Sequence, residues 1–277
     1  MNNVPTRWRT LARVLLFFVD CAAVLAGTAP LAPRGSGATA GLFIGTVASL
    51  GAFVLTFLFV RWEGLRLSDV GASLDRQSLL RLALGFLIGL FIVALQTLMM
   101  WVAGHVRWEL SEEVNVAATT IPLIAYLSLS AREELAFHGY PLQRLVPSFG
   151  LWPGQLLVAL VFAAEHRVGG SSWGHALVGA GAGSLLFGMA AIASRGLALP
   201  IGLHAAWNLG DWMRGGKGWN GPWKAVVAEG CEECTQLVGI VSYLLVVFSA
   251  TLLFWLWYRF VEKGNRELGV GATERLQ

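Results

Sequence analysis

The chain has 277 residues, of which 56% are hydrophobic and only 13% charged, and its mean hydropathy is +0.62. Soluble domains average about 25% charged residues, so this composition excludes a water-soluble globular protein and predicts a polytopic membrane protein. The net charge of +3 does not indicate nucleic-acid binding, because no Lys/Arg cluster is interleaved with aromatic residues in a polar domain.

Apolar runs follow one another along the whole chain, and a membrane span needs about 20 such residues. The first run comes after three arginines, as in a signal peptide, but no cleavage site follows it, so we expect a retained first helix. The polar segments between the runs are too short to fold separately, so residues 1–277 are expected to form a single integral membrane domain. The predicted fold is an all-α bundle of about eight transmembrane helices, at residues 11–31, 41–60, 79–103, 116–146, 151–166, 173–194, 197–213 and 237–260.

The basic residues predict the orientation of these helices. With the N-terminus in the cytoplasm, 13 of the 20 Lys and Arg residues fall on the cytoplasmic side and six on the other, which leaves Arg132 inside a span. This bias fits the positive-inside rule with both termini cytoplasmic. The high content of Ala, Gly, Leu and Arg favours a bacterial inner (plasma) membrane.

Two short patterns have more than one interpretation. Cys231-Glu-Glu-Cys234 is a CxxC in a polar loop, which fits a local disulfide, half of a metal site, or neither. The spacings Gly85 to Gly89 and Gly179 to Gly183 fit ordinary packing of membrane helices or a close backbone approach beside a site.

Ionisable residues inside spans are costly and are therefore candidates for function. The fourth run contains Arg132-Glu133-Glu134, and Glu134 shares a helix face with His138 four residues later. A carboxylate in such a position suits a general base. The structural alternative is a Glu–Arg or Glu–His pair that holds helices together.

Two later runs contain further polar groups. Phe162 and His166 are four residues apart in the fifth run, and His204, Asn208 and Asp211 form a polar stripe on one face of the seventh. Polar groups on three apolar segments need partners, and in hydrocarbon the nearest partners are one another. A buried glutamate can activate water while His and Asn donors stabilise an oxyanion, which are the requirements of amide hydrolysis.

The ordered set of motifs, EExxxR then FxxxH then HxxxN, resembles the CAAX protease and bacteriocin-processing family of glutamate-dependent intramembrane endopeptidases. The resemblance covers about residues 116–213 and includes the lead-in Leu199-Pro-Ile-Gly-Leu-His204. It implies that Glu133 activates the attacking water with help from His166. It also implies that His204 and Asn208 form the oxyanion hole and that Glu134 has an orienting role.

The family is often described as metalloproteases, and the residues fit either a metal-free or a metal-dependent mechanism. A catalytic zinc site needs three protein ligands and a water. Glu133, His166 and His204 would supply them if a divalent metal such as zinc is bound.

This chain departs from the family at one position, because the Arg of the first motif is His138. An Arg would pair with Glu134 as a charged fork, whereas a His is shorter and titrates near neutral pH. The departure puts the supporting role of His138 in question more than the residues that activate water. Phe162 is the other expected supporting residue.

The resulting hypothesis is an intramembrane endopeptidase that cuts a membrane-associated or lipid-anchored protein or peptide, with a C-terminal sorting tail as one class of substrate. The alternatives are a non-catalytic membrane scaffold or chaperone of the same fold and a proton-coupled transporter. The expected partners are this substrate and the lipid bilayer, without nucleic acid.

Overall fold

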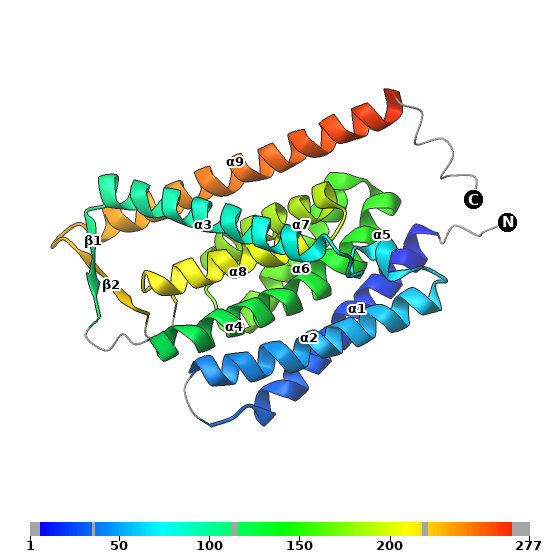
Figure 1. Cartoon of the computed structure of the whole chain (residues 1–277), viewed down its shortest axis with the longest axis horizontal. Helices are drawn as coiled ribbons and strands as arrows, with labels where there is room; N and C mark the ends of the chain where they lie inside the picture. The colour runs from blue at the N-terminus through cyan, green and yellow to red at the C-terminus, as the bar shows by residue number, and fades with distance from the viewer. Residues whose placement is uncertain (1–5, 35–36, 112–115, 218–220, 268–277) are drawn as a thin grey trace.

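The computed structural model describes residues 6–34, 37–111, 116–217 and 221–267, and it confirms the all-α prediction (Figure 1). Arg275, one of the basic residues counted for orientation, lies outside the described residues. The eight apolar runs correspond to eight continuous helical stretches. In chain order these are α1 (Arg7–Thr28), α2 (Gly37–Trp62), α3 (Ser78–Ala103), α4 (Val116–Glu133) with α5 (Tyr140–Phe149), α6 (Leu151–Val168), α7 (Ala182–Ser194), α8 (Ala198–Met213) and α9 (Glu232–Glu267).

Two of these stretches contain π-helical turns, in which the backbone makes one wider turn. The turn at Glu134–Gly139 joins α4 to α5, and the turn at His175–Gly181 leads into α7. Single π-helical turns inside α-helices are often found at functional sites. Here the first of them lies on one of the motifs that the sequence singled out.

Five of the described helices are long and apolar enough to cross a membrane. They are Arg7–Leu31, Gly37–Trp62, Ser78–Ala103, His175–Ser194 and Glu232–Gly264. The stretches that remain, α4 with α5, α6 and α8, carry the charged and polar motif residues. In Figure 1, α4, α6 and α8 run between α3 and α9 on one side and α1 and α2 on the other, although α4 and α6 keep exposed apolar side chains such as Ile124, Leu156 and Leu160.

A two-stranded antiparallel ribbon is the feature that the sequence did not predict. Strand β1 (Val106–Leu110) follows α3, and β2 (Trp223–Val227) precedes α9, with Trp108 opposite Ala225. The sequence marked these segments only as polar loops. In Figure 1 the ribbon caps one end of the bundle, and α1 begins and α9 ends at the opposite end.

Helices α3 and α8 pack backbone against backbone, and glycines make this possible. A Cβ atom added at Gly85 would overlap the carbonyl oxygen of Leu199, and one added at Gly202 would overlap that of Leu82. The Gly85–Gly89 spacing therefore has both expected features, since it packs two helices together and brings their backbones close beside the site. The contact fixes the position of α8, which carries two of the candidate site residues.

The buried side chains form two apolar clusters, one on each side of the site. The first joins α1, α2, α5 and α6 around Phe17, Tyr140 and Phe162, and the second joins α3, α7, α8 and α9 around Leu186 and Met189. Because apolar packing surrounds the polar motif residues on both sides, their hydrogen-bond partners must come from within the site.

The three cysteines carry no disulfide in this structure. Cys21 is buried in the first apolar cluster, while Cys231 is half-buried and Cys234 is exposed. The CxxC lies at the start of α9, at the same end of the bundle as the ribbon.

Candidate active site

The adjacent glutamates of the first motif both contact one imidazole. Oε1 of Glu134 lies 2.8 Å from Nδ1 of His204, and Oε2 of Glu133 lies 3.4 Å from its Nε2. Adjacent residues of a helix point about 100° apart, so the two carboxylates approach the ring from its two different nitrogens. Glu133 is the last residue of α4 and Glu134 the first of the π-helical turn, so the change of helix type falls between them.

This arrangement constrains the protons of His204. A carboxylate only accepts hydrogen bonds, so the Nδ1–H of His204 donates to Glu134. Its Nε2 faces Oε2 of Glu133 at 3.4 Å, which is an electrostatic contact rather than a hydrogen bond. His204 is 4% exposed, and the ring of Phe187 stacks on it with centroids 4.0 Å apart.

His138 keeps a hydrogen bond to Glu134 at the position where the family has Arg. Its Nδ1 lies 2.7 Å from Oε2 of Glu134, and its Nε2 lies 3.0 Å from the hydroxyl of Ser184 on α7. Both His138 and Glu134 are fully buried. The expectation that Glu134 and His138 share a helix face is confirmed.

A guanidinium group neutralises the other glutamate. Arg132 donates from one terminal nitrogen to Glu133 at 2.7 Å and from the other to Glu165 at 2.5 Å. The arginine is buried, so it connects α4 to α6 in a low-dielectric setting where each of the three charges needs its partners. Both pairings that the structural alternative expected, Glu–Arg and Glu–His, are thus present.

His166 has a fixed tautomer when its ring is neutral. Its Nδ1 lies 3.0 Å from the carbonyl oxygen of Phe162, which only accepts, so Nδ1 carries the proton and Nε2 keeps a lone pair. The ring of Phe162 packs at 4.6 Å from that of His166 and at 6.4 Å from that of His204. Phe162 is therefore a buried apolar spacer between the two imidazoles.

Asn208 has a partner on each side of its amide. Its Nδ2 donates to the hydroxyl of Ser130 at 3.3 Å, and its Oδ1 accepts from Nζ of Lys217 at 2.7 Å. Ser130 lies one turn before Glu133 on α4, so Asn208 on α8 faces the same helix as His204 does. The side chains of three separate motifs therefore meet at the contact of α4, α6 and α8.

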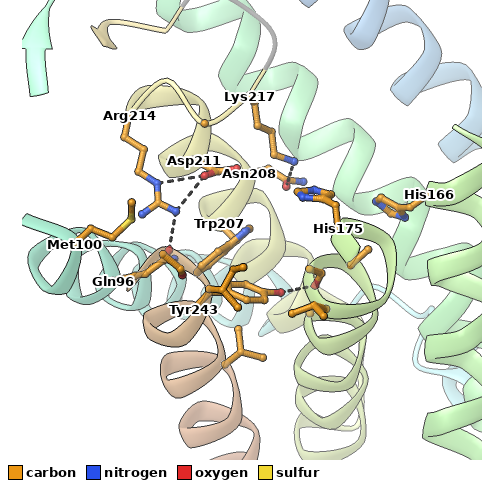
Figure 2. Close-up of a pocket in the computed structure, with 18 of the residues that line it drawn as sticks. Gln96, Met100, His166, His175, Trp207, Asn208, Asp211, Arg214, Lys217 and Tyr243 are labelled. Atoms are coloured by element: carbon orange, nitrogen blue, oxygen red, sulfur yellow. Dashed lines mark hydrogen bonds and ion pairs between the residues drawn. The ribbon is translucent and has the colours of Figure 1, made fainter. Parts of the chain in front are cut away.

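A cavity of about 630 Å³ borders this cluster, beneath the ribbon (Figure 2). Its wall includes His166 and Phe162 from α6 and the polar stripe His204, Asn208 and Asp211 from α8, as the sequence predicted for that stripe. Its other walls are mainly apolar and come from α3, α7, α9 and the ribbon. The lining residues from those walls include Met100, Trp108, Val178, Leu186, Ile240, Tyr243 and Val247.

The structure separates the predicted site residues into two layers. His166, His204 and Asn208 line the cavity, whereas Glu133, Glu134 and His138 lie behind them and reach the cavity through His204. Of these three, Glu133 alone retains some exposure, with 13% of its side chain accessible. The electrostatic partners of Glu133 include Arg132, His204, His166 and Lys217, so its charge interacts with groups of both layers.

The sequence predicted no site role for Ser130, Glu165 or Lys217, and it gave Arg132 only a structural role, as a partner of a glutamate inside a span. The charges of Arg132 and Glu165 within apolar runs were a usable signal, since buried charges in a membrane protein need partners. No local pattern indicates Ser130 or Lys217, because their contacts to Asn208 join residues that are 78 and 9 positions apart.

The residues present do not fit a metal site. Within the described part of the chain, no group of three or more His, Cys, Asp or Glu side chains could hold a metal ion. Glu133 is paired with Arg132, whose positive charge would oppose a nearby cation.

Comparison with known families identifies the central part of the chain. Residues 115–210 match the Rce1-like family of type II CAAX prenyl endopeptidases. This Rce1-like segment contains all three motifs and nearly coincides with residues 116–213, over which the motif resemblance was recognised. The match confirms that recognition and supports a CAAX-protease-like membrane enzyme that acts on a membrane-associated peptide. No curated protein matches the chain.

Proposed function

We propose that the protein is an intramembrane endopeptidase that hydrolyses a peptide bond in a membrane-associated or lipid-anchored substrate. The observation that carries the proposal is the position of His204, which contacts both glutamates on one side and borders the cavity together with His166 and Asn208 on the other. The two oxyanion donors thereby lie at the wall of a space that can hold a peptide bond, and the general base Glu133 lies directly behind His204.

In the proposed reaction, Glu133 takes a proton from a water molecule while the water oxygen forms a bond to the substrate carbonyl carbon. The N–H groups of His204 and Asn208 stabilise the oxyanion that develops. The C–N bond then breaks, and the leaving amine receives the proton from Glu133. His166, whose Nε2 has a lone pair when neutral, assists by orienting the water.

Glu134 and His138 act behind this layer. Because Glu134 accepts the Nδ1–H of His204, it fixes the ring so that the Nε2 side faces Glu133 and the reacting carbonyl. His138 holds the second oxygen of Glu134 and takes over the orienting contact that an Arg makes in the family motif.

The position of the cavity suggests the side from which substrate enters. The cavity lies beneath the ribbon, at the end of the bundle opposite the start of α1. With both termini cytoplasmic, as the positive-inside rule favours, this end faces away from the cytoplasm. A C-terminal sorting tail exposed on that face is therefore our proposed class of substrate.

The test compares protein termini in membranes from cells that express wild type, Glu133→Gln or Glu229→Gln at equal levels. Glu229 is exposed in the loop before α9, so its variant is a matched control for the loss of one carboxylate. We expect new termini with wild type and with Glu229→Gln, and accumulation of the uncut precursors with Glu133→Gln. Loss of a general base typically lowers the rate by a factor of about 10² to 10⁴.

Two outcomes would contradict this function. Identical termini in all strains, with a phenotype that requires the protein's presence, would favour the scaffold, and flux in proteoliposomes that depends on Glu133 would favour the transporter.

Treating the purified enzyme with a metal chelator distinguishes the metal-free reaction from a metal-dependent one. We expect cleavage to continue, and loss of cleavage that zinc restores would contradict the metal-free reaction.

A further inference from the structure

A lysine outside all three motifs contacts the proposed oxyanion hole. We propose that Lys217 is a positioning residue that fixes the Asn208 amide with its NH₂ group toward the reacting carbonyl. This inference rests on the proposed function and adds to it a residue that lies seven positions beyond the Rce1-like segment.

The chemistry of the two groups determines the orientation of the amide. Nζ of Lys217 lies 2.7 Å from Oδ1 of Asn208 (Figure 2). An ammonium group only donates hydrogen bonds, so the amide oxygen has to face it. A reversed amide would place NH₂ hydrogens against the ammonium hydrogens and lose this bond. The NH₂ group consequently points to the other side, toward Ser130 and α4.

The NH₂ group retains a hydrogen for the substrate. An amide nitrogen carries two hydrogens, and Ser130 accepts a bond from this nitrogen at 3.3 Å. Asn208 also lines the cavity and is 8% exposed. The second hydrogen can therefore donate to an oxyanion in the cavity, provided that the amide does not rotate.

Lys217 and Arg214 both line the cavity as cations, but they differ in their ion-pair partners. Arg214 is paired with Asp211 at 3.0 Å and donates to Gln96 (Figure 2). It also donates to Thr97. Lys217, in contrast, takes part in none of the ion pairs found between described residues. Its Nζ lies 5.8 Å from the centroid of the Tyr126 ring. The field of Lys217 reaches the charge of Glu133, and it also acts on negative charge that develops beside Asn208.

The chain is shaped to return Lys217 to α8. The backbone N–H of Gly215 bonds to the carbonyl of Trp212, and that of Gly216 bonds to the carbonyl of Asp211. Gly215 has a φ of 79°, in the left-handed region that favours glycine, and a Cβ there would lie 2.9 Å from the carbonyl oxygen of Trp223. This turn reverses the chain after α8, so residue 217 reaches back to residue 208.

The first experiment is a double-mutant cycle on the substrate that the comparison of termini identifies, with Lys217→Met, Asn208→Ala and the double variant. If Lys217 acts through Asn208, the double variant is no slower than Asn208→Ala. Loss of one oxyanion donor costs about 10²- to 10³-fold in kcat, so we expect Lys217→Met to lower kcat by about tenfold or more with little change in KM. Lys217→Arg should recover most of the rate, and Lys224→Met, in exposed β2, should leave it unchanged.

The results that would overturn the role of Lys217 differ from those that would refute the proteolytic function. Additive losses in the cycle, or a wild-type kcat in Lys217→Met, would overturn the inference while the proteolytic function stands. A rise in KM that disappears when the substrate's C-terminal carboxylate is amidated would assign Lys217 to substrate binding instead. A wild type that cleaves nothing would refute the function itself.

A spectroscopic readout tests the contact without any substrate. The chain has only six asparagines, so protein labelled with ¹⁵N at asparagine gives few side-chain amide signals, and Asn208→Ala identifies the relevant pair. We expect Lys217→Met to change the chemical shifts of this pair of signals and Lys224→Met to leave them unchanged. An unshifted pair in Lys217→Met would overturn the inference.

Discussion

Nδ1 of His138 lies 2.7 Å from Oε2 of Glu134, and both side chains are fully buried. This hydrogen bond explains how the chain keeps the second glutamate of the motif in place without the family's Arg. His138 also contacts Ser184, so it ties the π-helical turn to α7. The departure from the motif thus changes the residue but retains a partner for Glu134.

Removing this imidazole should destabilise the fold. His138→Ala leaves one oxygen of a buried carboxylate without its donor, and breaking a buried pair in this way costs about 3–5 kcal/mol. We expect a clearly lower temperature of thermal unfolding in detergent. His175→Ala, which removes an exposed imidazole, is the control and should unfold like wild type.

Replacing His138 by the Arg of the family motif should not raise the stability or the activity of the protein. The pocket around His138 is filled, because a Cβ added at Gly188 on α7 would lie only 3.0 Å from its ring. Overfilling a packed core costs about 1–3 kcal/mol, so His138→Arg should also unfold at a lower temperature than wild type. A His138→Arg variant with wild-type stability and activity would contradict this account of the site.

The Arg132 bridge should matter more for stability than ion pairs at the surface. Arg132→Met leaves Glu133 and Glu165 without their shared partner, and the expected cost is about 3–5 kcal/mol, measured by thermal unfolding in detergent. Arg107→Met breaks an exposed pair with Glu109 on β1 and should change stability little. Equal effects of the two substitutions would mean that Arg132 is not held in a low-dielectric setting.

Close packing of α3 on α8 should make Gly85 intolerant of a side chain. Gly85→Ala places a Cβ against the carbonyl of Leu199 and should lower stability by about 1–3 kcal/mol. Activity should fall as well, because α8 carries His204 and Asn208. Gly27→Ala in α1 is the matched control, since nothing lies within 4 Å of its added Cβ, and it should be neutral or stabilising.

The orientation of the bundle can be tested with the CxxC cysteines. Cys234 is exposed at the end of the bundle beside the ribbon. If the positive-inside rule holds, a membrane-impermeant maleimide should label it in intact cells after mild reduction. A cysteine introduced by Leu74→Cys, between α2 and α3 at the other end, should react only after the cells are permeabilised. The opposite pattern would place the cavity on the cytoplasmic side.

Several features of the protein could be predicted from the sequence because they depend on composition or on short spacings. The scarcity of charge and the apolar runs indicated a membrane helix bundle. Helical periodicity placed Glu134 beside His138, and it placed His204, Asn208 and Asp211 on one face of α8. The order of the motifs predicted the family, which the match over residues 115–210 confirms.

Tertiary structure decided which groups meet. Regular helix geometry points Glu133 and Glu134 in different directions, yet both contact His204, about 70 positions away. The close packing of α3 on α8 fixes the position of α8 and therefore of His204 in the bundle. The bridge from Arg132 to Glu165, the ribbon and the return of Lys217 to Asn208 are also contacts between separate segments. Local spacing fixes the direction in which a side chain leaves its own helix, but its partner depends on how the helices pack, which no short pattern encodes.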